Sequence, residues 1–367
     1  MNYLEKLLAV NFKREYCKIV GSGTIGIYLS LKALGLKNQL VAIPNNVCYN
    51  VPLAVILSGN SPIYIDIDLE TLSLSPKSLK NHINMINAVI AVHGYGNMCD
   101  IDSIDTICKN RKIPLIEDCC LSYGANFMGR PAGSYGDISI LSFGSSKIID
   151  VGHGGAILSN DESLLNEIMQ LETNLPLYSS EHRKSISQLG IIFKNIYNSF
   201  YLNGLNKVCS TFINELDKSK EAFLFKFSDL YLEKIYNEVK FIENNIFYRK
   251  RNFERINEFL SEVQGEFIDI KYPTKGSVIW RACLFVKDRR NELLKFLLQK
   301  KYEVSSWYPS IDIFFRKNKS QRYSTPNSDW VSDHIVNLLV SKKINNSYLY
   351  NISQDIIKFY KEDKKYD

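Results

Sequence analysis

Three residue types within one stretch of the chain could together bind and activate an aldehyde cofactor. Asp118 ends the strand-like run PLIED, Ser142 ends the run ISILS, and Lys147 follows five residues later. The glycine-rich run GHGG (152–155) comes next. A carboxylate can hold a protonated pyridine nitrogen, a hydroxyl can bind a phosphate, and a lysine amine can condense with an aldehyde. This ordered set predicts a site for pyridoxal 5'-phosphate (PLP).

Lys147 is the expected catalytic residue. In PLP catalysis a lysine holds the aldehyde and, once an incoming amine displaces it, moves the proton between the substrate carbon and C4' of the cofactor. Lys147 follows a strand, so a sharp loop would place it at the carboxyl edge of the sheet, where open α/β sheets bind ligands. A solvated loop lysine is the commoner fate of this residue type. The spacing from Ser142 and the glycines that follow favour the cofactor.

The acid for the ring nitrogen is expected to be Asp118 and not its neighbour Glu117. Side chains alternate along a strand, so only one of two consecutive acids faces the site. A carboxylate beside a pyridine nitrogen keeps that nitrogen protonated, which makes the ring an electron sink. The alternative role for Asp118 is to cap the following turn. The presence of Lys147 favours the cofactor-binding role over this capping role.

A glycine-rich turn near the N-terminus could bind phosphate. The run GSGTIG (21–26) precedes the helical stretch IYLSLKALGL. Backbone N–H groups at a helix N-terminus, together with hydroxyl groups, form phosphate sites. Capping of the helix by Thr24 would explain the same pattern.

The elements around these motifs predict an α/β fold. Short apolar runs alternate with helical stretches such as 101–109, which implies a mainly parallel sheet with helices on both faces. Residues 165–240 are helical and polar, and the later chain predicts a smaller α+β unit. We therefore expect a large domain at 1–240 and a small C-terminal domain at 241–367. The expected strands are Leu40–Ile43, Pro62–Asp66, Ala88–Val92, Pro114–Glu117, Ile138–Phe143 and Ala156–Leu158.

The motifs resemble those of the DegT/StrS family of PLP-dependent sugar aminotransferases. The pattern G-x-x-P-x-x-x-D-x-D at 59–68 and the run VHGYG at 92–96 are similar to family segments. The resemblance covers nearly the whole chain but is sparse from about 165 to 230. It implies the aspartate-aminotransferase-like fold, with a sheet of the seven-stranded type.

The resemblance also assigns residues to the cofactor. It implies that Ser142 and the amides of Thr24 and Ile25, in the loop that includes Gly23, hold the phosphate. The aromatic residue that stacks on the pyridine ring in the family aligns with Cys48, and Tyr49 is one position later.

Three departures from the family concern contacts near the cofactor. Leu121 stands where the family has Gln or His to contact the phenolic oxygen. His153 replaces a Glu, and could contact a substrate phosphate or serve as a backbone cap. The family's intersubunit Asn-x-Arg-Met loop has no counterpart before Ser228.

A second group of residues falls in the segment that approaches substrate in the family. These residues are Arg281, Trp307 and Tyr308. Core packing with one surface arginine is the alternative reading of the three. The sequence supports substrate contact and core packing equally.

The resemblance implies an aminotransferase that moves the amino group of glutamate to a keto-sugar, expected to be nucleotide-linked. Alternatives are transamination of a small keto-phosphate, another PLP reaction such as dehydration or decarboxylation, or a non-catalytic protein of this fold. Retention of Lys147 argues against the non-catalytic reading and against dehydration, because the family's dehydrating branch has His there. The resemblance further implies a homodimer, to which residues 170–228 would contribute a partner's part of the site.

Composition and charge exclude other classes of function. With 367 residues, 45% apolar and 12% aromatic, the chain is typical of globular proteins. The net charge of +6 is dispersed, which argues against nucleic-acid binding but suits a phosphorylated substrate. The eight cysteines form no C-x-x-C pair, and no stretch resembles a secretory leader or a membrane span. We expect a cytoplasmic protein with free thiols, no metal and no membrane contact.

Overall fold

The computed structural model describes residues 1–203, 209–315 and 323–363. A seven-stranded sheet forms its centre, and the strands follow the order β1-β11-β10-β7-β6-β2-β3. Strands β10, β7, β6, β2 and β3 are parallel, whereas β11 is antiparallel to both of its neighbours. The predicted α/β fold with a mainly parallel sheet is confirmed. The strands are β1 (Tyr16–Val20), β2 (Leu40–Pro44), β3 (Ser61–Ile65), β6 (Ala88–Val92), β7 (Leu115–Asp118), β10 (Ile138–Ser142) and β11 (Gly155–Ser159).

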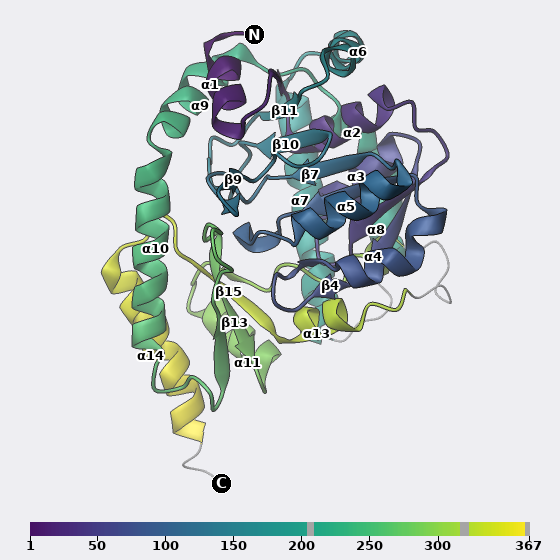
Figure 1. Cartoon of the computed structure of the whole chain (residues 1–367). Helices are drawn as coiled ribbons and strands as arrows, with labels where there is room; N and C mark the ends of the chain where they lie inside the picture. The colour runs from purple at the N-terminus through teal and green to yellow at the C-terminus, as the bar shows by residue number, and fades with distance from the viewer. Residues whose placement is uncertain (204–208, 316–322, 364–367) are drawn as a thin grey trace.

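Helices cover both faces of this sheet (Figure 1). Successive side chains of a strand point to opposite faces, so Val89 packs in one apolar cluster and Ile90 in the other. The first cluster includes residues of α1 (Tyr3–Phe12), α4 (Pro76–His82) and α5 (Ile101–Arg111). The second includes residues of α2 (Gly23–Ala33), α3 (Asn50–Leu57), α6 (Glu162–Thr173), α7 (Ser180–Asn203) and α8 (Cys209–Ser219).

A smaller antiparallel sheet follows in the second part of the chain. Its strands are β12 (Ile268–Lys271), β13 (Arg281–Val286), β15 (Ile335–Leu339) and β14 (Val304–Ser305), in that order across the sheet. A third apolar cluster joins this sheet to α10 (Ile242–Phe259), α11 (Arg290–Gln299) and α14 (Asn346–Asp363). In Figure 1 the long helix α10 runs along the side of the molecule, from the level of the large sheet down to α14. The domain boundary at residue 240 stays a prediction.

The remaining elements are short. Strand β4 (Ile67–Asp68) pairs with β5 (Ser73–Leu74), and β8 (Asn126–Phe127) pairs with β9 (Arg130–Pro131). The other helices are α9 (Leu232–Lys240), α12 (Asp312–Phe315) and α13 (Pro326–His334). Within the described ranges no helix is both long and apolar enough to cross a membrane. The seven cysteines other than Cys209 are free thiols.

Candidate active site

A cavity of about 720 Å³ lies where β7 and β10 end at the carboxyl edge of the large sheet. Parallel strands carry the residues at their carboxyl ends to one edge, and ligands of open α/β sheets bind there. The structure brings Asp118, Ser142 and Lys147 into the lining of this one cavity, together with the loop 21–24. We call Gly23, Thr24 and these three residues the inner wall.

Ser22, and not Thr24, caps helix α2. The Ser22 hydroxyl accepts a hydrogen bond from the Ile25 N–H at 3.2 Å, and the extended backbone of Ser22 is typical of an N-cap. Ile25 is fully buried and its N–H is already bonded, whereas Gly23 and Thr24 line the cavity. The loop therefore presents Gly23 and Thr24 to a ligand.

Close packing explains the glycine at position 23. A Cβ atom there would lie 2.9 Å from Cys120 Sγ and 3.1 Å from Ser142 Cβ, both too close for a side chain. The loop is thus pressed against the end of β10. The Ser142 Oγ accepts a hydrogen bond from the Gly144 N–H at 3.3 Å, which leaves its own proton available to a ligand.

Lys147 lies in the loop between β10 and β11. The two ends of this loop are tied together, because the Phe143 carbonyl accepts the N–H groups of Val151 and Gly152, each at 3.0 Å. Ser146, directly before Lys147, has a φ of +64°, so the chain turns sharply there. The sharp loop predicted for Lys147 is present.

Side chains from other elements hold the backbone of this loop. The Ser146 carbonyl accepts a hydrogen bond from the indole N–H of Trp280 at 2.6 Å. The Ile148 carbonyl accepts one from Asn245 Nδ2 at 2.8 Å. The Lys147 carbonyl accepts the guanidinium of Arg249 at 3.4 Å. Three consecutive carbonyls are therefore fixed, while the Lys147 amine has no ion pair among the described residues.

Arg249 is a buried cation that serves this loop. Its guanidinium also donates to the Trp280 carbonyl at 2.7 Å and to Asn245 Oδ1 at 2.7 Å. Burial and the nearby charge of Arg281 lower the pKa of Arg249 to about 10. The residue is 5% exposed, so its partners must replace the water that it has lost.

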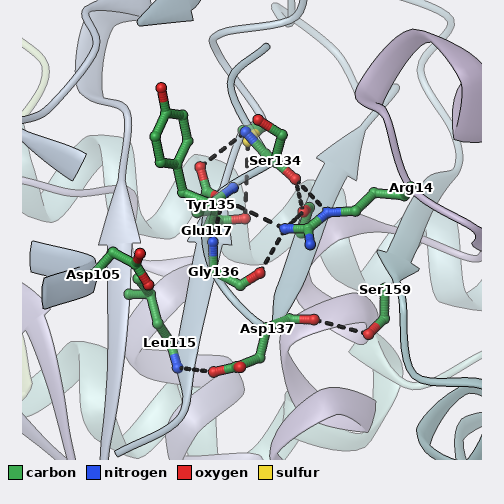
Figure 2. Close-up of polar contacts among 12 residues, drawn as sticks. Arg14, Asp105, Leu115, Glu117, Ser134, Tyr135, Gly136, Asp137 and Ser159 are labelled. Carbon is green, nitrogen blue, oxygen red and sulfur yellow. Dashed lines mark hydrogen bonds and ion pairs between the residues drawn. The ribbon is translucent and has the colours of Figure 1, made fainter. Parts of the chain in front are cut away.

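Glu117 has a structural role that occupies its whole carboxylate (Figure 2). It accepts the N–H groups of Tyr135 at 2.6 Å, Gly136 at 2.7 Å and Gly133 at 2.8 Å, and Arg14 lies 3.6 Å away. The side chain of Glu117 is fully buried. No part of this carboxylate is left for a ligand.

His93 completes the network on the same carboxylate. Its Nε2 lies 3.2 Å from Glu117 Oε2, and Cys99 contacts its Nδ1 at 3.3 Å. Burial alone would raise the pKa of Glu117, but the hydrogen bond with His93 and the backbone donors lower it below its ordinary value. Both residues thus stabilise the turn that follows β9.

Asp118 is the acid that faces the cavity. It is 4% exposed, and its Oδ1 accepts the Cys120 N–H at 2.9 Å, which leaves Oδ2 open. Burial raises the pKa of the thiols of Cys48 and Cys120, and the charges of Asp118 and Lys147 act on both thiols in opposite directions. The two charges therefore lie near the same pair of thiols.

Tyr49 packs away from the cavity. Its ring lies 4.6 Å from that of Phe193 and 5.5 Å from that of Phe212, between centroids. Cys48, the preceding residue, lines the cavity. Leu121 is buried in the first apolar cluster.

His153 lines the cavity but is held by its own chain. Its Nε2 accepts the Ser228 N–H at 3.2 Å, and its ring stacks on Phe225 and Phe227. Burial, and then the charge of Arg183, lower the pKa of His153 to about 4. The ring is therefore neutral near pH 7 and supports the segment around Ser228.

Arg281, Trp307 and Tyr308 make packing contacts. Arg281 donates to Ser305 Oγ at 2.7 Å and lies over the Trp280 ring. The Tyr308 ring stacks on Trp280 with centroids 5.7 Å apart, and the Trp307 ring stacks on Phe193 at 5.6 Å. The cavity lining does not include these three among the described residues.

A second group of lining residues was not anticipated from the sequence. We call it the outer wall: Tyr178, Arg183, Ile186, Ser187, Phe223, Phe225, Tyr231 and Lys234. A Cβ atom on Gly21 would lie 2.5 Å from the Phe225 carbonyl, so this segment is packed directly on the loop of the inner wall. Most of the group falls within 170–228, the stretch expected to serve a partner, and it lines the cavity of its own chain.

The amino-acid sequence is similar to those of known proteins. GDP-perosamine synthase of Escherichia coli O157:H7 is 32% identical over 176 residues, which is 47% of this chain and 48% of that protein. A dTDP-3-amino-3,6-dideoxy-alpha-D-galactopyranose transaminase of Aneurinibacillus thermoaerophilus is 26% identical over 337 residues, 89% of this chain and 81% of that one. The chain matches about half the length of the first of these relatives.

Solved structures share the fold. DesI, determined in the presence of its TDP-sugar product, superposes with a TM-score of 0.77 at 18% identity, over 96% of this chain and 82% of that one. NtdA of Bacillus subtilis with bound PMP gives a TM-score of 0.74 at 22% identity, over 96% and 76%. The family model for DegT/DnrJ/EryC1/StrS aminotransferases matches residues 1–194, more than half of the chain. The protein therefore belongs to the DegT/DnrJ/EryC1/StrS aminotransferase family.

Proposed function

We propose that this protein is a PLP-dependent aminotransferase that moves the amino group of glutamate to a nucleotide-linked keto-sugar. The observation that carries the proposal is the inner wall. One cavity is lined by an open carboxylate, a hydroxyl with a free proton, a glycine-rich helix N-terminus and a lysine that has no ion pair among the described residues.

The inner wall fits the cofactor. The lack of a Cβ atom at Gly23 lets the backbone of the helix start pack against Cys120 and Ser142 at the cavity. Asn50 also lines the cavity, and its Oδ1 is buried without a hydrogen-bond partner among the described residues. Bound PLP supplies an aldehyde that condenses with amines and a ring that withdraws electrons. Asp118 Oδ2 would hold the ring N–H, and the phosphate would lie between Ser142 and the amides of Gly23 and Thr24.

The amine of Lys147 would move the proton in both halves of the reaction. The fixed carbonyls of Ser146 and Ile148 hold the loop, so only the side chain of Lys147 has to move. In the first half such an amine would take a proton from the α-carbon of the donor and deliver it to C4' of the cofactor. In the second half it would take a proton from C4' and deliver it to the carbon that becomes aminated. Cys48 would border the ring of the cofactor in place of an aromatic side chain.

The substrates are proposed from the relatives. The names of two matched proteins, GDP-perosamine synthase and a dTDP-amino-sugar transaminase, describe nucleotide sugars. A cavity of about 720 Å³ has room for a ligand larger than an amino acid. Aminated sugars of this class would serve polysaccharide biosynthesis in the cytoplasm.

A two-step assay tests the function. PLP-loaded protein is mixed with L-glutamate, and 2-oxoglutarate formation and the visible spectrum are followed. We expect stoichiometric 2-oxoglutarate, and then amination of a nucleotide keto-sugar, detected by mass spectrometry. Lys147→Ala protein is the control and should yield neither product. Absence of 2-oxoglutarate from wild-type protein would contradict the proposed activity.

We also propose that the protein acts as a homodimer. Several large apolar side chains of α1 and α10 are exposed, including Val10 at 74% and Phe247 at 62%. A two-fold dimer would bury one such face on both subunits at once. Light scattering at assay concentration should give twice the mass of the chain, and a fully active monomer would contradict this.

A further inference from the structure

We propose that Arg183 and Lys234 form an anion subsite that binds the diphosphate of the acceptor substrate. This inference rests on the proposed function, because it assigns one part of the acceptor to residues of this chain. Both side chains are exposed at the rim of the cavity, whereas Asp118 lies at its buried end.

The charges that line the cavity favour an anionic ligand beyond the cofactor phosphate. Lys147, Arg183 and Lys234 are cationic, and Asp118 is the one carboxylate among the described lining residues. His153 is neutral near pH 7, since its pKa is lowered to about 4 by burial. A cavity lined mainly by one sign of charge concentrates ligands of the opposite sign.

Arg183 is held in place without being neutralised. Its guanidinium donates to the hydroxyl of Tyr231 at 2.7 Å and to the hydroxyl of Tyr178 at 3.4 Å. Both partners are uncharged, and no carboxylate pairs with Arg183 in the part of the chain that the structure describes. A guanidinium has five N–H donors, so these contacts leave donors for a phosphate in a planar, pre-positioned group.

Lys234 lines the same cavity and lies close to the same tyrosine in sequence. It follows Tyr231 by three positions at the start of α9, and residues three apart are neighbours on a helix surface. The nearest acids in sequence, Glu233 and Glu238, lie outside the lining of the cavity, and Glu238 pairs with Lys342 at 2.7 Å. Arg183, Tyr231 and Lys234 therefore line one cavity, in which one extended anion can contact both cations.

The position of this pair favours the acceptor over the amino donor. The proposed reaction takes place at Lys147, inside the cavity, and the donor carries its carboxylates only a few bonds from its amine. A nucleotide-linked sugar is long enough to reach from Lys147 to exposed residues. The rings of Tyr178 and Tyr231 beside the cations also offer surfaces that suit a sugar or a base.

Calorimetric titration of PLP-loaded protein with GDP, dTDP and inorganic pyrophosphate tests the subsite. We expect Arg183→Gln and Lys234→Gln each to raise the Kd of these diphosphates at least tenfold. The matched controls are Lys184→Gln and Lys240→Gln, which change exposed cations on the same two helices outside the cavity lining. These controls should change the Kd less than twofold, and 2-oxoglutarate formation from L-glutamate should stay at the wild-type rate in both control variants.

Several results would overturn the subsite. One is failure of the diphosphates to bind wild-type protein, and another is an equal effect on the Kd in the Arg183 and Lys184 variants. A third is a matching loss of the L-glutamate reaction in the Arg183 and Lys234 variants, which would assign these cations to the carboxylate of the amino donor. The proposed function fails separately, when wild-type protein makes no 2-oxoglutarate. The diphosphate titration does not depend on turnover, so it still reports on the subsite in that case.

Discussion

The two walls of the cavity are built in different ways. The inner wall consists of residues at strand ends, in the loop after β10 and at the start of α2, so the hydrogen bonds of the large sheet and of α2 fix most of their positions. The outer wall comes from helices and from the irregular segment 223–231, which stacked rings and a few hydrogen bonds such as Ser228 to His153 hold in place. The inner wall is therefore the more rigid of the two.

This difference suggests a division of labour. Groups that carry out chemistry must be held within a fraction of an ångström, and the sheet edge provides that. Groups that select a substrate can lie on elements that vary, such as helices and loops around a rigid scaffold. Changes to the inner wall should therefore alter cofactor binding or turnover, and changes to the outer wall should alter substrate affinity.

The largest effect is expected from Glu117→Gln, which removes the support beneath the inner wall. The change leaves Arg14 buried without a charged partner and places an amide donor against backbone N–H groups. Loss of one member of a buried charged network costs about 3–5 kcal/mol of unfolding free energy. Urea unfolding measures this. A loss below 1 kcal/mol would show that the turn after β9 does not depend on Glu117.

Asp118→Asn should leave stability intact and slow the reaction. The amide still accepts the Cys120 N–H, but it no longer favours a protonated ring nitrogen. We expect a barrier increase of about 2–4 kcal/mol in kcat. Stopped-flow measurement of the L-glutamate reaction, with the thermal midpoint as control, checks both parts. Wild-type turnover in this variant would move the role away from Asp118.

Arg249→Met should loosen the Lys147 loop without touching the cavity. The variant loses the hydrogen bonds to the carbonyls of Lys147 and Trp280 but keeps an apolar stem of similar length. We expect kcat to fall about tenfold, which corresponds to about 1.4 kcal/mol. The KM for L-glutamate should stay within twofold, because Arg249 contacts no substrate. Equal changes in KM and kcat would indicate general unfolding of the site.

The outer wall should respond to pH through His153. The folded chain protonates this ring only near pH 4, whereas an unfolded histidine titrates near pH 6.5. Between these values the unfolded chain holds more protons, so the free energy of unfolding falls as the pH falls. His153→Gln should reduce the slope of the unfolding free energy against pH by the equivalent of up to one bound proton. Urea unfolding at a series of pH values between 4 and 7 measures this slope. An unchanged slope would mean that the ring is not held neutral.

The sequence indicated that the residues of the inner wall come together, because local patterns determine their positions. Asp118 and Ser142 end apolar strands and Lys147 follows one, and the sheet topology brings such positions together. Two local details are not determined by such patterns. Thr24 and Ser22 are both good caps, and only the backbone shows that Ser22 has the role. Strand alternation likewise does not decide between Cys48 and Tyr49, because both precede a helix.

The outer wall could not be predicted in this way. Arg183 is one of three exposed cations on α7, and its contacts with Tyr178 and Tyr231 distinguish it. The contact with Tyr231 joins residues 48 positions apart through the folding of 223–231 over Gly21. Long-range packing of this kind leaves no local sequence signal.

The identity of the lysine that holds the cofactor tests the account most directly. PLP-loaded protein is reduced with borohydride, digested and mapped by mass spectrometry. We predict a pyridoxyl group on Lys147 and a visible absorbance band that the Lys147→Ala variant lacks. A pyridoxyl group on another lysine, or no band after PLP addition to wild-type protein, would contradict the assignment of the inner wall.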